Sequence, residues 1–379
     1  MKGSVTKKGS KYYIIVDIGR DNTGKRKQKW YGGFKTKKEA EKELIKVLNQ
    51  IENNTFINPD KITVSEYLKQ WLYDYVEKNL APVTIESYRT NIEKHIIPCL
   101  GLNLLQKMQP IHIQQFYNEM LVKGRTDGKG GLSPKSVLYL HRILREAINH
   151  ALKLQLVNRN VVDLVEPPRQ KSFKAKFLNE NQVQILLDTL KYTNLYIPTL
   201  LAVGLGLRRG EALGLKWDDI DFEDKTITIS RSLLPSQKGV IFHDPKTEKS
   251  NRVIIAPNTI LLELQKLKDK QQEHKDLLGD AYKKDNLVCC YNDGSYFNPA
   301  TFSGLFLKAL RRYKLEEIRF HDLRHTNATL MLKHNIPAKV ASERLGHSGI
   351  GITLDLYSHV MKEMQEEAAN KIEKAIFNN

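Results

Sequence analysis

Two adjacent prolines, Pro167 and Pro168, constrain most strongly how this chain folds. Proline fixes its own φ and lacks the amide hydrogen that helices and sheets use, so neither element continues through such a pair. Apolar residues recur at helical spacing from 62 to 165, whereas helical and β-rich stretches alternate from 177 onward. A chain of 379 residues is also long for a single core. We therefore expect a domain boundary here, with a basic linker over 166–176.

The segment from 62 to 165 is predicted to be a helical domain. Its four amphipathic stretches run over 64–75, 84–97 and 111–121 and onward from Pro134. Ser133 suits the N-cap of the fourth helix and Pro134 its first position. Pro98 is expected to end the second helix. Apolar stripes of this kind normally form a core, so they indicate a fold and not a function.

Residues 1–57 are predicted to form a three-stranded sheet with one helix, because β-rich stretches flank a turn at 21–24 and Thr36 with Glu39 makes a capping box. Residues 1–60 contain 14 Lys or Arg against 7 Asp or Glu. A two-stranded ribbon fits the major groove of DNA, although spacing alone is equally compatible with an ordinary solvated hairpin. The candidate DNA contacts are Arg20, Lys25, Arg26, Lys27 and Lys29 in this hairpin and Arg169, Lys171, Lys174 and Lys176 in the linker.

The net charge of +17 favours a polyanionic partner, which is DNA, RNA or an acidic membrane surface. No apolar run approaches the ~20 residues of a membrane-spanning helix, and the first residues lack the apolar core of a signal peptide. The three cysteines, Cys99, Cys289 and Cys290, make no framework for disulfides or zinc, so we expect a reducing compartment, the cytoplasm. Cys289 and Cys290 are expected in a buried strand.

The segment 177–379 ends with a dense group of guanidinium, imidazole and phenol side chains. They occur in His321-Asp322-Leu323-Arg324-His325, in Leu345-Gly346-His347 and in Tyr357-Ser358-His359. Carboxylate-rich sets suit metal ions, whereas this set suits an anion such as a DNA phosphate. Zinc is the alternative at His321 and His325, but a zinc protease needs Glu where this chain has Asp322.

Two further fragments precede this group. Arg208 and Glu211 lie in Gly206-Leu207-Arg208-Arg209-Gly210-Glu211, and Lys246 lies in Pro245-Lys246-Thr247, where we expect the turn of a hairpin. Arg209 and Arg252 are expected to be surface charges or contacts to the DNA backbone. No Gly-x-x-x-x-Gly-Lys-Ser/Thr motif is present, so ATP is not expected.

In this order, the five fragments resemble the tyrosine recombinases, in particular the integrases of temperate phages and conjugative transposons. The resemblance implies a multidomain α+β fold. A small β-sheet-plus-helix domain for arm-type DNA (1–57) precedes a helical, SAM-like core-binding domain (62–165). A mainly α catalytic domain with a small β-sheet (177–379) follows the linker.

The resemblance implies that Tyr357 attacks a DNA phosphodiester, giving a 3′-phosphotyrosine and a free 5′-hydroxyl. A phenol is both a nucleophile and a leaving group for the reverse reaction. Lys246 would protonate the departing 5′-oxygen, and His321 would assist proton transfer at Tyr357. No metal and no cofactor are expected.

The phosphate itself would be held by Arg208 and Arg324, because a guanidinium stays charged and its fork of donors fits two phosphate oxygens. His347 would add a hydrogen bond. Glu211 and Asp322 would orient the arginines or histidines without touching the phosphate.

Double-stranded DNA, with separate core and arm sites, is the implied partner, and four copies of the chain would act on two duplexes. A DNA-bending accessory or excision factor is a further expected partner, and a helix over 361–377 packs on its own domain or on a neighbouring subunit. Two alternatives remain open. One is a type IB topoisomerase or telomere resolvase, and the other is a non-catalytic DNA-binding regulator.

Overall fold

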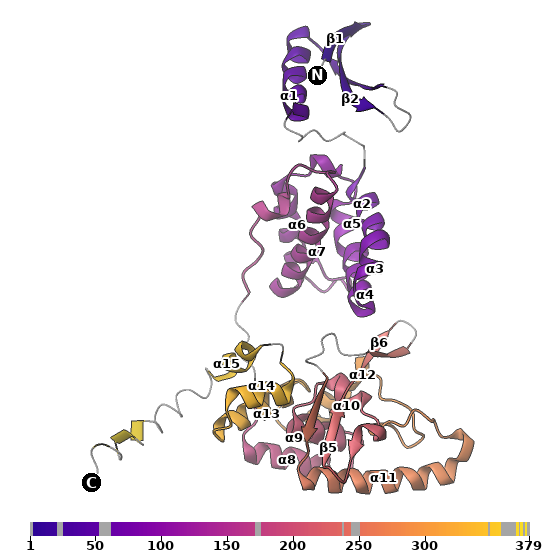
Figure 1. Ribbon diagram of the computed structural model, residues 1–379, viewed down its shortest axis with the longest axis vertical. Helices are drawn as coiled ribbons and strands as arrows, with labels where there is room; N and C mark the ends of the chain where they lie inside the picture. Colours follow the sequence, from indigo (N-terminus) through magenta and orange to yellow (C-terminus); the bar gives the residue numbers. More distant parts are fainter. Residues whose placement is uncertain are drawn as a thin grey trace. The chain divides into compact units, whose positions relative to one another are not determined.

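The computed structural model describes residues 3–20, 26–52, 62–170, 176–236, 239–243, 251–347 and 349–357, with five further positions between 369 and 376. The chain divides into two compact units, Met1–Lys171 and Ser172–Asn379 (Figure 1). The first unit contains the N-terminal and the helical domain, and each domain has a hydrophobic core of its own.

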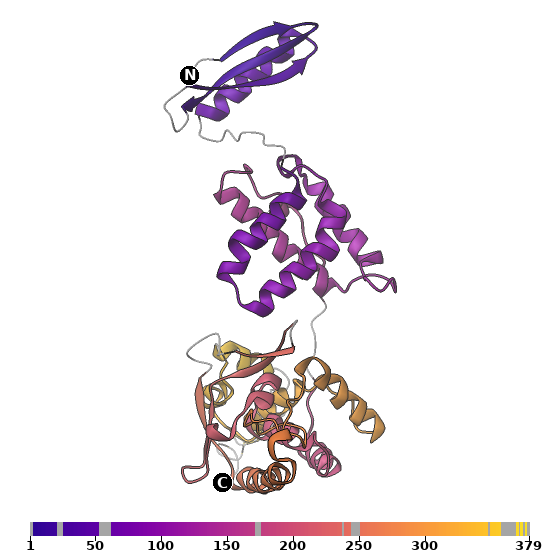
Figure 2. The same cartoon turned by 90° about the vertical axis from the view of Figure 1, so that its right-hand side faces the viewer.

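The N-terminal domain is a three-stranded antiparallel sheet with one helix, as predicted. The strands lie in the order β1 (Gly3–Lys8), β2 (Lys11–Arg20) and β3 (Arg26–Phe34). Helix α1 (Lys37–Glu52) covers one face of the sheet (Figure 2). Its capping box is present, since the Glu39 amide donates to Thr36 Oγ1 at 3.2 Å and the Thr36 amide donates to Glu39 Oε2 at 3.3 Å.

The helical domain packs its apolar stripes into one core around Trp71, Phe116 and Leu140. Ser133 caps the longest helix as expected, because its Oγ accepts from the Ser136 amide at 3.2 Å. The elements are α2 (Val64–Trp71), η1 (Leu72–Val76), α3 (Glu77–Asn79), α4 (Pro82–Asn91), η2 (Ile92–Ile96), α5 (Ile97–Leu100), η3 (Leu105–Lys107), α6 (Pro110–Lys123), α7 (Pro134–Lys153) and η4 (Val161–Leu164).

The prediction that Pro98 ends the second helix was wrong. The π-helical turn η2 carries the chain directly into α5, where Pro98 lies in the first turn. The Ile97 amide donates to the Ile92 carbonyl, one residue further back than in an α-helix. A wider turn just before Pro98 makes room for a ring that has no amide hydrogen to donate, so the helix continues.

The second unit is mainly helical, with a three-stranded sheet in the order β4-β5-β8 and a two-stranded sheet β6-β7. Its elements are α8 (Glu180–Leu190), α9 (Tyr196–Leu205), α10 (Arg209–Gly214), η5 (Trp217–Asp219), β4 (Ile220–Asp221), β5 (Thr226–Ile229), β6 (Ser232–Ser236), β7 (Gly239–His243), β8 (Arg252–Ile255), α11 (Asn258–Leu278), η7 (Gly279–Ala281), α12 (Pro299–Arg312), α13 (Asp322–Lys333), α14 (Ala338–Leu345) and α15 (Ile350–Tyr357).

Helices α9 and α13 pack together at the centre of this unit. Helix α9 is apolar nearly all round and is buried, with Leu201 and Leu205 completely inaccessible. Helix α13 buries both apolar and polar residues, and Leu332 packs with Leu345 of α14 in a second small core. The ends of α9, α13 and α14 are therefore fixed relative to one another by core packing.

Cys289 and Cys290 do not form a strand of the kind expected. Cys289 is buried, but the segment makes only isolated bridges, from Leu287 to Lys216 and from Cys290 to Tyr296. The turn after Cys290 folds the chain back at once, so no longer ladder forms.

Candidate active site

The turn between α9 and α10 brings two arginines to one place. Helix α9 ends at Gly206, which has left-handed backbone angles (φ 69°, ψ 24°), and Arg208 then begins α10. The Gly206 carbonyl accepts a hydrogen bond from Arg324 Nη1 at 2.7 Å. A Cβ at position 206 would lie 2.3 Å from Leu345 Cδ2 and 2.8 Å from Asn327 Oδ1. Only glycine therefore permits this approach of α9 to α13.

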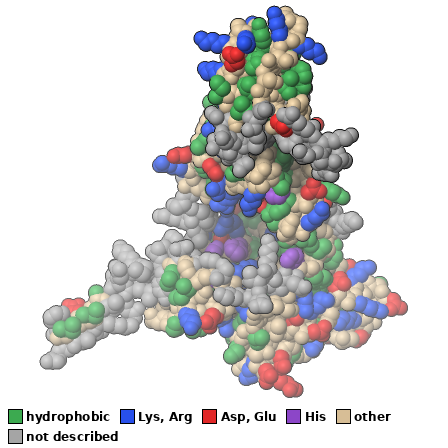
Figure 3. All heavy atoms as spheres, turned by 45° about the horizontal axis from the view of Figure 1, so that its top comes forward, with side chains coloured by type: hydrophobic (Ala, Val, Ile, Leu, Met, Phe, Trp, Pro, Cys, Tyr) green, Lys and Arg blue, Asp and Glu red, His purple; other side chains and the backbone are tan. Residues whose placement is uncertain are grey.

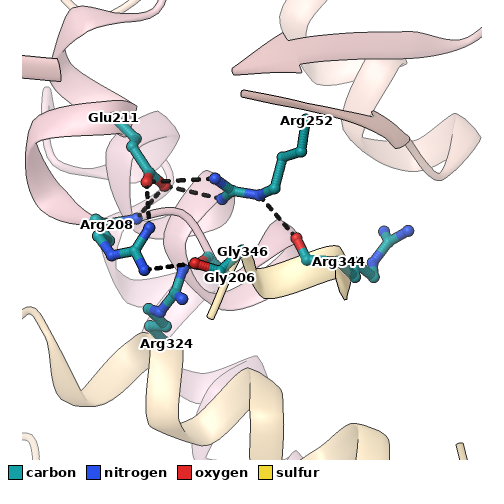
Figure 4. Close-up of polar contacts among 7 residues, drawn as sticks. All are labelled: Gly206, Arg208, Glu211, Arg252, Arg324, Arg344 and Gly346. Atoms are coloured by element: carbon teal, nitrogen blue, oxygen red, sulfur yellow. Dashed lines mark hydrogen bonds and ion pairs between the residues drawn. The ribbon is translucent and has the colours of Figure 1, made fainter. Parts of the chain in front are cut away.

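Arg208 is held from two sides (Figure 4). Its Nη1 donates to Glu211 Oε1 at 2.6 Å, and its Nη2 donates to the Gly346 carbonyl at 2.8 Å. The Arg208 side chain is 36% exposed, whereas that of Glu211 is 5% exposed. The carboxylate therefore lies beneath the guanidinium and leaves part of it open to a ligand.

The Glu211 carboxylate is shared between two arginines. Arg252 Nη2 donates to Glu211 Oε2 at 2.9 Å, and Arg252 is itself only 7% exposed. Burial raises the pKa of Glu211, but the hydrogen bond and charge of Arg252, together with Arg208, lower that pKa to about 2. Glu211 is thus ionised at neutral pH. The expectation that Arg252 is a surface charge was wrong, because its guanidinium is buried against this carboxylate.

Arg324 is the most buried cation of the group, at 2% exposure in the first turn of α13. Among the described residues, its buried Nη2 has no hydrogen-bond partner. Burial, followed by the charge of Arg208, lowers the pKa of Arg324 to about 9, so it remains protonated at neutral pH. A buried charged donor without an acceptor is costly, and an anion bound beside Arg208 would supply the acceptor.

His347 follows α14 directly. That helix ends at Gly346 in a left-handed conformation, and His347 Nδ1 lies 2.8 Å from Thr353 Oγ1 of α15. Burial, followed by the charges of Arg324 and Arg208, lowers the pKa of His347 to about 4. The imidazole is therefore neutral at pH 7. When the Thr353 hydroxyl donates to Nδ1, Nε2 carries the proton and can donate to an anion.

His321 and His325 stack edge to face, with ring centroids 4.9 Å apart. Burial, followed by the neighbouring His325 and Arg324, lowers the pKa of His321 to about 4. Asp322 contacts neither the imidazoles nor the two clustered arginines in any hydrogen bond we find among the described residues. It accepts from Arg319 Nη2 at 2.6 Å and from the Arg319 amide at 2.9 Å, and so anchors the start of α13.

Lys246 lies outside the described residues. The strands on either side of it, β7 and β8, belong to different sheets, with β7 paired to β6 and β8 to β5. The prediction that Lys246 occupies the turn of a hairpin falls on residues outside the described part and stays a prediction. Tyr357 is the last residue of α15, one turn after Thr353, and its side chain is outside the described part.

The basic residues proposed for DNA contact are only partly described. Lys25, Lys171 and Lys174 lie outside the described residues, as do the side chains of Arg20, Arg26, Lys27 and Lys29 on β2 and β3. Arg169 is exposed, and the exposed Lys176 donates to the Glu317 carbonyl at 3.3 Å. Lys and Arg side chains project from the N-terminal domain, at the top of Figure 3. Most of the expected helix over 361–377 is also outside the described part.

Sequence reasoning missed Arg252, Thr353 and the carbonyls of Arg344 and Gly346. In the sequence, Arg252 directly precedes the apolar run 253–255, and this position is the feature that could have indicated that its side chain lies near a core. No group of three or more His, Cys, Asp or Glu among the described residues is arranged to hold a metal ion. Within the same residues, no helix is long and apolar enough to cross a membrane.

Three family descriptions match successive parts of the chain. Residues 4–51 match the "Arm DNA-binding domain", 63–121 the "Phage integrase, N-terminal SAM-like domain" and 176–364 the "Phage integrase family". The first two matches lie in the first compact unit and the third lies in the second.

Solved structures show the same fold. The R225K variant of the Tn1549 transposon integrase (aa 82-397) in complex with a circular intermediate DNA superimposes with a TM-score of 0.66 at 20% identity, over 80% of this chain and 99% of that one. A lambda integrase dimer bound to a COC′ core site gives a TM-score of 0.58 at 19% identity, over 93% of both chains. A lambda integrase tetramer bound to a Holliday junction gives 0.56 at 18%, over 91% and 95%.

Sequence identity to two relatives shows the family as well as the fold. The ICEBs1 integrase of Bacillus subtilis is 27% identical over 74% of this chain and 75% of its own length. The "Tyrosine recombinase XerC-like" protein of Caldanaerobacter subterraneus subsp. tengcongensis is 30% identical over 98% of both chains. With similarity of this extent and a site built from clustered arginines and a histidine, the chain belongs to the phage integrase family of tyrosine recombinases, enzymes of site-specific DNA recombination.

Proposed function

We propose that the cluster of Arg208, Arg324 and His347 binds the phosphate at which DNA is cut and rejoined, and that Tyr357 is the nucleophile. The observation that carries the proposal is the buried Nη2 of Arg324, which has no acceptor among the described residues and lies in the same cluster as the partly open Arg208. An oxyanion is the ligand that satisfies both. Integration and excision of a mobile element is the corresponding biological reaction.

The two guanidiniums stabilise the transition state by binding the non-bridging oxygens, where negative charge accumulates. Both are fixed before the substrate arrives, Arg208 by Glu211 and Gly346 and Arg324 by the Gly206 carbonyl. Fixed donors need no reorganisation during the reaction, and loss of one such donor typically slows an enzyme by about 10²–10³-fold. The neutral His347 contributes a third donor through Nε2.

Tyr357 attacks phosphorus through its phenolic oxygen, and the 5′-oxygen of the next nucleotide leaves with its bonding electrons. Helix α15 carries both Thr353 and Tyr357, so the same short helix that orients His347 also delivers the nucleophile. Lys246 gives a proton to the departing oxygen and His321 assists proton transfer at the phenol. The phosphotyrosine ester preserves the energy of the broken bond, so the reaction needs neither ATP nor a metal ion.

Double-stranded DNA is the proposed partner, bound at core sites by 62–165 and 177–379 and at separate arm sites by 1–57. The linker over 166–176 joins the two core-binding parts, and its basic residues contact the backbone of DNA. Support comes from the DNA-bound dimer and tetramer of lambda integrase, whose fold this chain shares. We infer a homo-tetramer on two duplexes, assisted by a DNA-bending or excision factor, in the cytoplasm.

The test uses a nicked suicide substrate made from a candidate attachment site, incubated with the full chain in EDTA. We expect an SDS-resistant protein–DNA adduct with the wild type and none with Tyr357→Phe, which should still shift the DNA in a native gel. Tyr192→Phe is the control, because Tyr192 is 95% exposed on the same unit, and it should form the adduct normally.

Two outcomes would overturn the proposal. An adduct formed by Tyr357→Phe would refute the nucleophile assignment. If the wild type binds attachment sites in the gel shift but forms no adduct on any of them, the chain would be a non-catalytic DNA-binding regulator. If it relaxes supercoiled DNA of arbitrary sequence, it would be a type IB topoisomerase.

A further inference from the structure

Arg252 makes three directed contacts to other described residues from a buried position on β8 (Figure 4). Its Nη2 donates to Glu211 Oε2 at 2.9 Å and its Nη1 to Glu211 Oε1 at 3.3 Å. Its Nε donates to the Arg344 carbonyl at 2.9 Å. One guanidinium therefore joins the carboxylate that holds Arg208 to the helix that ends just before His347.

The contact at Arg344 lies at the C-terminal end of α14. The last carbonyls of a helix have no partner within the helix and form the negative end of its dipole, so cations stabilise them. Arg252 binds the Arg344 carbonyl and Arg208 binds the Gly346 carbonyl. A Cβ at position 346 would lie 3.1 Å from Arg252 Nη1, so the guanidinium also packs directly against this turn. Two arginines thus fix the segment from which His347 extends.

The contact at Glu211 decides how much positive charge remains for a ligand. Among the described residues, the cluster contains three guanidiniums and one buried carboxylate, and Oε1 of that carboxylate accepts from both Arg208 and Arg252. Without Arg252, the carboxylate would be balanced by Arg208 alone. Arg208 would then offer less net charge to a phosphate, because charges separated by a few ångströms in a poorly solvated site interact strongly.

We propose that Arg252 is a positioning residue of the recombination reaction. By binding the Glu211 carboxylate and the Arg344 carbonyl together, it keeps the charge of Arg208 available to the phosphate and holds the segment that carries His347. The inference rests on the proposed function of the Arg208, Arg324 and His347 cluster. Arg252 itself touches neither the phosphate nor the nucleophile in this scheme.

The test measures single-turnover cleavage of the suicide substrate, recording the rate constant and the amplitude separately. A folding defect lowers the amplitude, which reports the active fraction, whereas a positioning defect lowers the rate constant of the active molecules. Arg252→Met should cleave on the order of 100-fold more slowly than the wild type, from the loss of one unit of positive charge near the phosphate. Arg252→Lys should be intermediate, since lysine keeps the charge but cannot span both acceptors.

A second substitution separates electrostatics from simple structural damage. Arg252→Met leaves a buried carboxylate with too little compensation and risks unfolding, whereas Arg252→Met with Glu211→Gln removes both charges, which buried pairs often tolerate. We expect the double variant to cleave at least about tenfold faster than Arg252→Met, because Arg208 regains its full charge. Recovery should be incomplete, since the contact to the Arg344 carbonyl is still missing.

Arg231 and Asp219 provide a matched control, because they form another largely buried ion pair of the same unit outside the cluster. Arg231→Met should change the amplitude or the unfolding temperature but leave the cleavage rate constant within about threefold.

Each outcome has a defined meaning. Wild-type rates for Arg252→Met overturn this inference, and so does a double variant that is no faster than the single one. If Arg252→Met does not fold, a double variant that cleaves more than 100-fold more slowly than the wild type also overturns it. If the wild type itself forms no adduct, the proposed function has failed instead.

Discussion

We call the proposed pair of phosphate-binding guanidiniums, Arg208 and Arg324, the clamp. Replacing Arg208 with lysine tests whether this clamp depends on the shape of the guanidinium or only on its charge. Arg208 donates through Nη1 to Glu211 Oε1 at 2.6 Å and through Nη2 to the Gly346 carbonyl at 2.8 Å, and the side chain is still 36% exposed. It therefore binds two protein groups and retains an open edge for a ligand. A lysine ammonium has one nitrogen, which cannot satisfy both acceptors and a phosphate in the same geometry.

The magnitude follows from the contact that lysine loses. A hydrogen bond to a charged group contributes about 1.5–3 kcal/mol, so loss of one such bond to the transition state corresponds to about 10- to 150-fold in rate. Affinity for the core site should fall by less than about threefold, because the net charge that governs DNA binding is unchanged. We therefore expect Arg208→Lys to cleave DNA slowly while it binds the core site almost as tightly as the wild type does.

The assay is single-turnover adduct formation on the suicide substrate, with DNA affinity measured in parallel by gel shift. Arg209→Lys is the matched control, because this neighbouring arginine contacts Ser303 Oγ at 2.9 Å and lies outside the proposed clamp. It should cleave within about threefold of the wild type, since the one hydrogen bond it loses joins Arg209 to a serine hydroxyl and not to the phosphate. An Arg208→Lys enzyme within threefold of the wild type would refute the clamp, and an equal loss in Arg209→Lys would show that the effect is not specific.

Two further predictions concern the structure around the clamp. Gly206→Ala should destabilise the catalytic unit by roughly 2–4 kcal/mol in urea unfolding, because alanine is strained at φ 69° and its Cβ would collide with Leu345. Gly304→Ala, in a helix with nothing near the added Cβ, should instead stabilise it by about 0.5–1 kcal/mol. Acid should weaken the same unit. The pKa of His347 is lowered to about 4 in the fold, so the unfolded chain takes up the proton first as the pH falls below about 6.5. Stability present above pH 6.5 should be lost progressively as the pH falls toward 4, and His347→Gln should show a smaller loss over that range.

The resemblance to tyrosine recombinases singled out Arg208 and His347, and the structure places both in one cluster. Each follows a turn in which a glycine, Gly206 or Gly346, has a left-handed conformation. The helix-plus-sheet N-terminal domain and the Ser133 cap were readable from turn and capping residues. Each of these features is decided within a few residues of chain.

The features that sequence reasoning missed depend on tertiary partners. Arg252 is buried because Glu211, 41 residues earlier in the chain, supplies the compensating charge. An arginine before a short strand carries no local mark of such a partner, so the sequence predicts a surface charge or a contact to the DNA backbone. The effect of Pro98 was also not readable locally, because the π-helical turn that precedes it carries no sequence signature of its own and buries Ile92 and Ile96 in the core.

The contacts that position the three arginines also hold the helices of the catalytic unit together. Arg208, Arg252 and Arg324 come from three separate elements, and each binds a backbone carbonyl of another element, at Gly346, Arg344 and Gly206 respectively. Those carbonyls lie at helix ends or in the turns that follow them, where no helical partner is available, so the same contacts cap the helices and aim the guanidiniums. Among the described residues, Glu211 is the one carboxylate that forms ion pairs with these guanidiniums. Among the described residues, Arg324 Nη2 has no acceptor, and in the proposed function a DNA phosphate supplies one.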